Sequence, residues 1–258
     1  LARTLAPTTE ALILASATPH NGNSDSFKEI LRLLDPTSVR PDGTIDEEAA
    51  QRLIIRRHRN SEEVASFVGE KWAQRAEPRN IPVDASDKED AVARELNDTW
   101  RAQGKANPAG DPLFPWTLIK AFLSSPAALG ESVAGRLKRI GNADTAERRA
   151  LERLADLNEQ ITPYHSNKYN ALVNYLTEIG IKKGSPTRVV VFSERVATLH
   201  WLRENLIKNL KLPAAAVEVM HGGLPDEKQM QLVDDFKRTD SPLRILVTGD
   251  VASEGVNL

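Results

Sequence analysis

Four short segments of the chain combine hydroxyl, glycine and acidic residues at places where apolar runs end. They are residues 16–22 (SATPHNG), 193–195 (SER), 221–223 (HGG) and 248–257 (TGDVASEGVN). In an open parallel sheet, ligands bind at the carboxyl ends of the strands, where loops expose backbone N–H groups beside helix N-termini. Taken singly, each segment is explained better by ordinary turn formation. Together, and in this order, they indicate a ligand site at the edge of a sheet.

The elements that position the last three segments alternate between helix and strand. Strand-like runs at 188–192, 217–220 and 244–248 are preceded or separated by helical patterns at 166–180, 196–210 and 225–238. Strands that alternate with crossover helices are typical of a doubly wound α/β unit with a parallel sheet. The strand 244–248 is expected at an open edge of this sheet, where unpaired backbone groups predict self-association.

The first segment follows a short apolar run, 11–15 (ALILA), that stops at small polar residues. Such a run predicts a buried parallel strand that leads into a functional loop. A helix is expected after this loop, because the apolar residues between 27 and 34 form one stripe and the pair Asp35-Pro36 ends it.

The middle of the chain is expected to be helical. Ser86 and Glu89 have the spacing of a capping box, and Val92, Leu96 and Trp100 follow on one face. Helical patterns also run from residue 47 to 63 and from 116 to 157, whereas the Gly- and Pro-containing stretch 104–115 predicts a loop.

Composition limits the kind of protein. The chain has 258 residues, of which 40% are hydrophobic and 27% charged, so it can bury a core. It has no cysteine and a net charge of −2, so thiolate metal sites are excluded and any grip on nucleic acid must be local. The five histidines lack metal-ligand spacing, and no metal site is expected. No apolar stretch reaches the length of a membrane span, and a cytoplasmic protein without a membrane partner is expected.

The order and spelling of these segments resemble the Swi/Snf-type branch of superfamily-two helicases, and more closely its bacterial DISARM-like and RapA-like members. SATPHNG with the helix after it is similar to motif III, RVVVFSER to motif IV, HGGLPDEKQMQLVDDFK to the element after motif IV, and GDVASEGVNL to motif V. FLSSPAAL and SNKYNALVNYL resemble two helices that precede the second RecA-like domain in the bacterial members. The resemblance covers nearly the whole chain.

The resemblance implies roles in coupling and in nucleotide binding. Ser16 and Thr18 stand at motif III, where small hydroxyls link the nucleotide state to the grip on DNA. The residues that stand where motif V meets ATP and the interdomain cleft are Asp250, Glu254, Gly255 and Asn257. A plain turn at a strand end is the competing interpretation for Ser16 and Thr18.

It also implies contacts with DNA phosphates. The residues at these positions are Ser193, Gly222, Gly223 and Thr248, which offer hydroxyl or backbone N–H groups. For Ser193 and the glycine pair, a strand-to-helix turn is an equally good explanation. The family's usual arginine after the His-Gly-Gly segment is Gln229 here, which leaves a charge contact at that point in doubt. The arginines at 56, 57 and 59 are better explained as a solvated or salt-bridged cluster.

ATP hydrolysis needs a phosphate loop with a lysine and a carboxylate for magnesium. No G-x-x-x-x-G-K-[ST] pattern occurs in the sequence, and residues 46–49 (DEEA) only mimic the acidic box, because they follow a turn instead of an apolar strand. Motif VI is expected beyond residue 258. ATP and Mg²⁺ are therefore expected as cofactors of the intact motor, with none bound tightly by this chain, which is expected to be inactive alone.

The predicted fold class is α/β: a truncated RecA-like parallel-sheet domain, preceded by a mainly helical region and by the last strand of a first RecA-like domain. The expected boundaries are 1–40, 41–160 and 161–258. The expected function is part of an ATP-dependent motor that moves on double-stranded DNA, with defence-system or polymerase partners. The alternative is a non-catalytic module, derived from such a motor, that binds DNA or protein.

Overall fold

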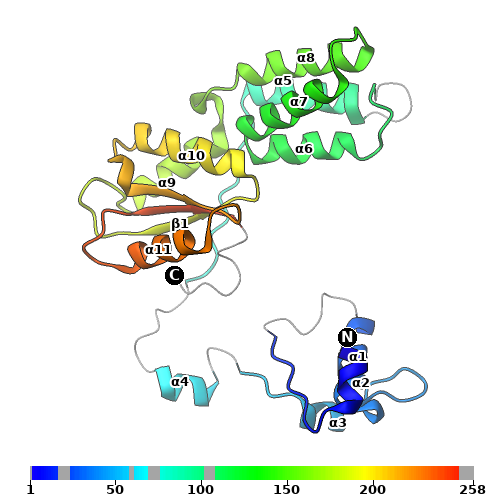
Figure 1. Ribbon diagram of the computed structural model, residues 1–258. Helices are drawn as coiled ribbons and strands as arrows, with labels where there is room; N and C mark the ends of the chain where they lie inside the picture. Colours follow the sequence, from blue (N-terminus) through cyan, green and yellow to red (C-terminus); the bar gives the residue numbers. More distant parts are fainter. Residues whose placement is uncertain (1, 17–23, 58–60, 69–75, 102–107, 250–258) are drawn as a thin grey trace. The chain divides into compact units, whose positions relative to one another are not determined.

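The computed structural model describes residues 2–16, 24–57, 61–68, 76–101 and 108–249 (Figure 1). Contacts group the chain into two compact units, Leu1–Pro78 and Arg79–Leu258, and each unit is described by itself. The region predicted from the sequence as a helical middle, 41–160, contributes residues to both units.

The first unit is small and mainly helical where it is described. Its α-helices are α1 (Ala2–Leu5), α2 (Ser24–Leu34), α3 (Glu47–Leu53) and α4 (Glu62–Val68). A short antiparallel bridge joins Val39 to Ile45. Leu31, Val39 and Ala50 form its buried cluster, with Phe27 and Ile45 packed against them.

The acidic stretch 46–49 begins a helix. Asp46 is the N-cap of α3 and its side chain accepts a hydrogen bond of 3.1 Å from the Ala49 N–H. This bond, followed by the hydrogen bond from Arg40, lowers the pKa of the Asp46 carboxyl. The structure therefore gives Asp46 a helix-capping role, which explains the resemblance to an acidic box.

Two sequence predictions for this unit are wrong. Residues 11–15 form no strand, and Ile13 is 90% exposed. The described residues of the unit offer this run no neighbouring strand, and a strand without a partner cannot complete its backbone hydrogen bonds. The helix predicted over 47–63 stops at Leu53, and Arg56 and Arg57 lie outside any helix. β-branched Ile54 and Ile55, which have a low helix propensity, follow the end of the helix.

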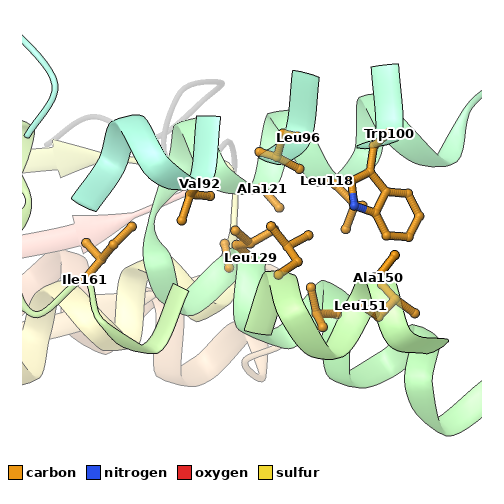
Figure 2. Packing of buried hydrophobic residues seen from close by; sticks show 12 residues of the cluster. Val92, Leu96, Trp100, Leu118, Ala121, Leu129, Ala150, Leu151 and Ile161 are labelled. Atoms are coloured by element: carbon orange, nitrogen blue, oxygen red, sulfur yellow. The ribbon is translucent and has the colours of Figure 1, made fainter. Parts of the chain in front are cut away.

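The second unit begins with a bundle of helices. They are α5 (Asp87–Glu95), a π-helical continuation (Leu96–Arg101), α6 (Phe114–Ser124), α7 (Pro126–Ile140) and α8 (Ala146–Glu159). The predicted capping box is present: Ser86 accepts from the Glu89 N–H, and the Glu89 side chain accepts from the Ser86 N–H. Figure 2 shows the core of the bundle, where Leu96 and Trp100 project from the same helix toward Leu118 and Leu129. All four side chains are at most 2% exposed.

A three-layer α/β arrangement follows the bundle. Its elements are α9 (Asn167–Glu178), β1 (Val189–Phe192), α10 (Val196–Asn209), β2 (Val217–Met220), α11 (Asp226–Lys237) and β3 (Ile245–Thr248). The three strands are parallel in the order β1-β3-β2, with Val191 opposite Val247 and Val219 opposite Val247. These helices and strands lie within two residues of the ranges predicted from the sequence.

The alternation of strand side chains builds the two faces of this sheet. Val191, Val219 and Val247 pack in one cluster with residues of α9 and α10. Met220 and Leu246 point to the opposite face and pack with Leu232 and Phe236 of α11. Figure 1 shows α9 and α10 on one side of the sheet and α11 on the other. Both faces are covered, which explains why the strands are mainly apolar, with Glu218 of β2 as a half-buried exception.

The predicted position of 244–248 at an edge is wrong. β3 lies between β1 and β2, pairs with both, and is buried at all four of its positions. Among the described strands the edges are β1 and β2, so an open edge at β3 gives no reason for self-association. Across the part of the chain that the structure describes, no helix combines the length and apolarity needed to cross a bilayer.

Candidate functional site

The carboxyl ends of the three strands meet at one edge of the sheet. The Ser193 N–H, just after β1, donates to the Thr248 carbonyl at the end of β3 with a length of 2.9 Å. On the other side, the Gly249 N–H donates to the Met220 carbonyl at the end of β2 with a length of 3.3 Å. The backbone hydrogen bonds between the strands thus continue one residue beyond β1 and β3. They hold the segments that follow β1, β2 and β3 side by side.

Ser193 is half-buried at this edge. Its Oγ lies 3.4 Å from the Oγ of Ser124 at the end of α6. Two residues later the chain enters α10, whose N-cap, Arg195, provides no side-chain hydrogen bond to the first turn. The hydroxyl of Ser193 thus lies only a few residues before the first N–H groups of α10. Hydrogen-bond donors at the start of a helix are suited to binding an anion.

The His-Gly-Gly segment forms a tight turn after β2. The Gly223 N–H donates to Nδ1 of His221 over 3.1 Å. Gly222 and Gly223 are exposed. A Cβ atom at Gly223 would lie 3.0 Å from the His221 ring, which is too close without a shift of that ring. The Gln229 amide donates to the Leu224 carbonyl (2.8 Å), so Gln229 helps to hold this turn.

Thr248 differs from its neighbours because it is fully buried. Its Oγ1 lies 3.3 Å from the Gly249 carbonyl, to which it donates. Its own carbonyl accepts from Ser193. A direct contact with a phosphate would require this residue to be uncovered, so that contact stays a prediction, while in the structure Thr248 positions Ser193.

A groove of about 430 Å³ adjoins the end of β1. Its wall includes Ser124 and Phe192, together with Lys168 and Tyr169 at the start of α9. The Lys168 ammonium donates to the carbonyls of Leu123 and Ser124. Although Lys168 as a whole stays exposed, partial desolvation lowers its pKa.

Tyr169 is buried in the same wall, 2% exposed, and burial raises its pKa to about 12. Its ring packs edge-on against Trp201, with centroids 5.0 Å apart. Its hydroxyl has no hydrogen-bond partner among the described residues. The tyrosine therefore contributes packing, and its hydroxyl is held in the neutral form.

Sequence reasoning missed three residues beside this edge: Ser124, Lys168 and Thr198. All three bond residues at least 44 positions away in the chain. A contact of that range leaves no local pattern, although Ser124 and Lys168 lie in segments that resemble family helices.

The remaining predicted site residues are placed as follows. Ser16 is exposed and lies in the first unit, so nothing relates it to the strand ends. Thr18 lies outside the described residues, as do Asp250, Glu254, Gly255 and Asn257. Where side chains are described, no group of three or more His, Cys, Asp or Glu residues could hold a metal ion.

Comparison with known proteins agrees with this geometry. Residues 167–258 match the family described as helicase conserved C-terminal domain. The structure is similar to the helicase domain of Hef from Pyrococcus furiosus, with a TM-score of 0.52 and 14% identity over 89% of this chain. The chain spans 59% of that domain. No curated protein matches the chain.

These matches confirm the fold class: a helicase C-terminal, RecA-like domain with a small parallel sheet over residues 167–258, in a chain that is mostly helical. The strand expected from a first RecA-like domain is not present at 11–15.

Proposed function

We propose that this helicase-like chain is part of an ATP-dependent motor of the Swi/Snf type that moves on double-stranded DNA, and that its strand-end edge binds the DNA backbone. The motif spellings favour the bacterial DISARM-like and RapA-like branch, a cytoplasmic setting, and defence-system or polymerase partners.

One observation carries the proposal. Ser193 and the exposed Gly222-Gly223 pair lie just beyond the carboxyl ends of β1 and β2, and both of these described strands pair with the central strand β3. Hydroxyl and backbone N–H groups are donors suited to phosphate oxygens, and they bind without reading base sequence. A chain with a net charge of −2 needs such local donors, because it has no general attraction for DNA.

Hydrolysis is assigned to the intact motor. Asp250, Glu254, Gly255 and Asn257 are proposed to meet ATP, and Ser16 and Thr18 to couple its state to the grip on DNA. ATP and Mg²⁺ would be held with the help of a phosphate loop and an acidic box, which this sequence does not contain. We therefore expect that this polypeptide alone releases no phosphate from ATP above background, with or without DNA.

The experiment is a titration of a short fluorescent duplex with the purified chain at low and at physiological salt, read by anisotropy. We expect salt-sensitive binding that Ser193→Ala weakens by about fivefold, the worth of roughly one hydrogen bond. The matched control is Thr177→Ala, since Thr177 is exposed on α9 and its hydroxyl bonds only the Val173 carbonyl. Equal affinity of the two variants would remove Ser193 from the interface, and no binding by the wild type would overturn the proposal.

A further inference from the structure

Three hydroxyl groups connect the helical bundle to the sheet domain. The Oγ1 of Thr198, in the first turn of α10, lies 2.7 Å from the Oγ of Ser124 and 2.7 Å from the Oγ of Ser125. Ser125 and Thr198 are each 3% exposed. These short bonds, the first partly buried and the second buried, join the break between α6 and α7 to the start of α10.

At one end the row of hydroxyls reaches the cap of α7, and at the other end it reaches the hydroxyl of Ser193. At one end Ser125 is the N-cap of α7, and its Oγ accepts from the Ala128 N–H over 3.1 Å. At the other end the Ser124 Oγ lies 3.4 Å from the Oγ of Ser193. The last distance is long for a pair of hydroxyls, so this is the weakest link in the chain.

The junction is also held from outside the chain of hydroxyls. The Lys168 ammonium donates to the Leu123 and Ser124 carbonyls at the end of α6. The backbone of the α6–α7 junction is therefore fixed, and a change at Ser193 can act on the hydrogen bonds without first moving the helices.

Each hydroxyl has a single proton, so the three bonds allow four consistent arrangements, and two of these run in one sense from end to end. In the first, Ser125 donates to Thr198, Thr198 to Ser124, and Ser124 to Ser193, which leaves the Ser193 proton free for a ligand. In the second sense all donors reverse, and Ser193 can offer a ligand only lone pairs. Phosphate oxygens are acceptors, so a phosphate at Ser193 selects the first sense.

The two senses differ at α7. In the first, Ser125 donates to Thr198, which polarises its oxygen and makes it a better acceptor for the Ala128 N–H. In the second, the same oxygen accepts from both Thr198 and Ala128. We propose that Thr198 is a positioning residue through which an anion bound at Ser193 strengthens the N-cap of α7, so that binding at the strand ends is communicated to the helical bundle.

The proposal rests on the function proposed above, because it takes the DNA backbone as the anion. Its test is amide exchange at Ala128, measured by NMR on the whole chain with and without saturating short duplex DNA. We expect exchange to slow by about twofold or more with DNA in the wild type. Thr198→Ser keeps the hydroxyl and should respond like the wild type, whereas the isosteric Thr198→Val should not respond.

A second variant interrupts the row of hydrogen-bonded hydroxyls at another point. Ser124→Ala separates Thr198 from Ser193 while leaving the Ser125 side chain and its bond from the Ala128 N–H in place, so it should also abolish the response if Thr198→Val proves unstable. A normal response in either Thr198→Val or Ser124→Ala overturns the proposal, and so does a wild type that binds DNA without a change at Ala128.

The ligand-free samples separate this proposal from the function it rests on. Without DNA, Ala128 should exchange faster in Thr198→Val than in Thr198→Ser, since only the former loses the partner of Ser125. Equal exchange rates would contradict a link between Thr198 and the cap of α7. If the wild type binds no DNA, the proposed function fails, and this comparison still decides whether Thr198 supports the cap.

Discussion

Arg136 Nε lies 2.5 Å from Glu147 Oε1 in the seam between α7 and α8, and the two side chains are only 16% and 13% exposed. The guanidinium also lies 4.7 Å from the centre of the Phe114 ring. The pair therefore fixes two helices of the bundle with charges that are largely removed from water.

We predict that Glu147→Gln lowers the free energy of unfolding by about 2 kcal/mol, because it leaves the largely buried Arg136 charge without a charged partner. Urea unfolding followed by circular dichroism measures the loss. Glu152→Gln is the control: it breaks the pair of Glu152 with Arg148, where Glu152 is 47% exposed, and should cost less than about 1 kcal/mol. Equal losses would mean that burial of the pair is unimportant.

A second prediction concerns the start of the bundle. The Ser86 hydroxyl donates to the His165 carbonyl over 2.6 Å and accepts from the Glu89 N–H over 3.2 Å. Ser86→Ala removes both bonds and should destabilise the chain by about 1–2 kcal/mol. Ser66→Ala should change stability by less than about 0.5 kcal/mol, since exposed Ser66 bonds only the nearby Glu63 carbonyl. Thermal unfolding of both variants measures the two losses. Equal losses would contradict the capping role of Ser86.

The third prediction tests the turn after β2. Gly223→Ala places a methyl group 3.0 Å from the His221 ring and should displace that ring, so DNA affinity should fall by about threefold or more. Gly135→Ala is the matched control, because a Cβ there meets nothing within 4 Å. This control should raise helix stability by about 0.5–1 kcal/mol and leave DNA binding unchanged. An unaltered affinity for Gly223→Ala would exclude this turn from the interface.

The fourth prediction is a pH dependence caused by Tyr169. Its pKa is raised from 10.0 to about 12 in the folded protein. The folded state therefore keeps a proton that the unfolded state loses, and stability should decline between pH 10 and 12. Tyr169→Phe should remove about 1 kcal/mol of this decline at pH 11 while remaining folded at pH 8. Tyr164→Phe, at an 82% exposed position, is the control and should follow the wild type.

The elements of the sheet domain could be predicted because each has a local signature. Val189 to Phe192 is a run of β-branched and aromatic residues, and it is followed by Ser193 as a break. Helix α10 shows the same clarity, with Leu199, Leu202 and Leu206 on its buried stripe. These patterns arise within a few residues, so no knowledge of distant contacts is needed.

The order of the strands could not be predicted in this way. All three strands are short, mainly apolar and four residues long, and the sequence of β3 does not indicate that it pairs on both sides. The run 11–15 fails for a related reason, since an apolar run shows what a strand would bury but not whether a partner strand exists. The π-helical turn at Leu96–Arg101 was also hidden, because Val92, Leu96 and Trp100 fit an ordinary helical stripe equally well.

The candidate site was predictable only where it coincides with a strand end. Ser193, Gly222 and Gly223 follow directly from that rule, as does Thr248, although the rule does not reveal that Thr248 is buried. Thr198 gave no signal, because its hydroxyl partners lie 73 and 74 positions away. Long-range polar contacts of this kind depend on the packing of two helices, which sequence periodicity does not specify.

The position of β3 has a consequence for how the protein is made on the ribosome. In the described sheet β1 and β2 pair only with β3, which is the last of the three strands to be synthesised. While the chain is being synthesised, the backbone groups of β1 and β2 therefore stay unpaired until Ile245–Thr248 has emerged. The helical bundle precedes them and is built mainly from neighbouring helices, so it can fold while translation continues. A pause in synthesis between β2 and β3 would leave two apolar strands exposed, and this interval is where the nascent chain most needs a chaperone.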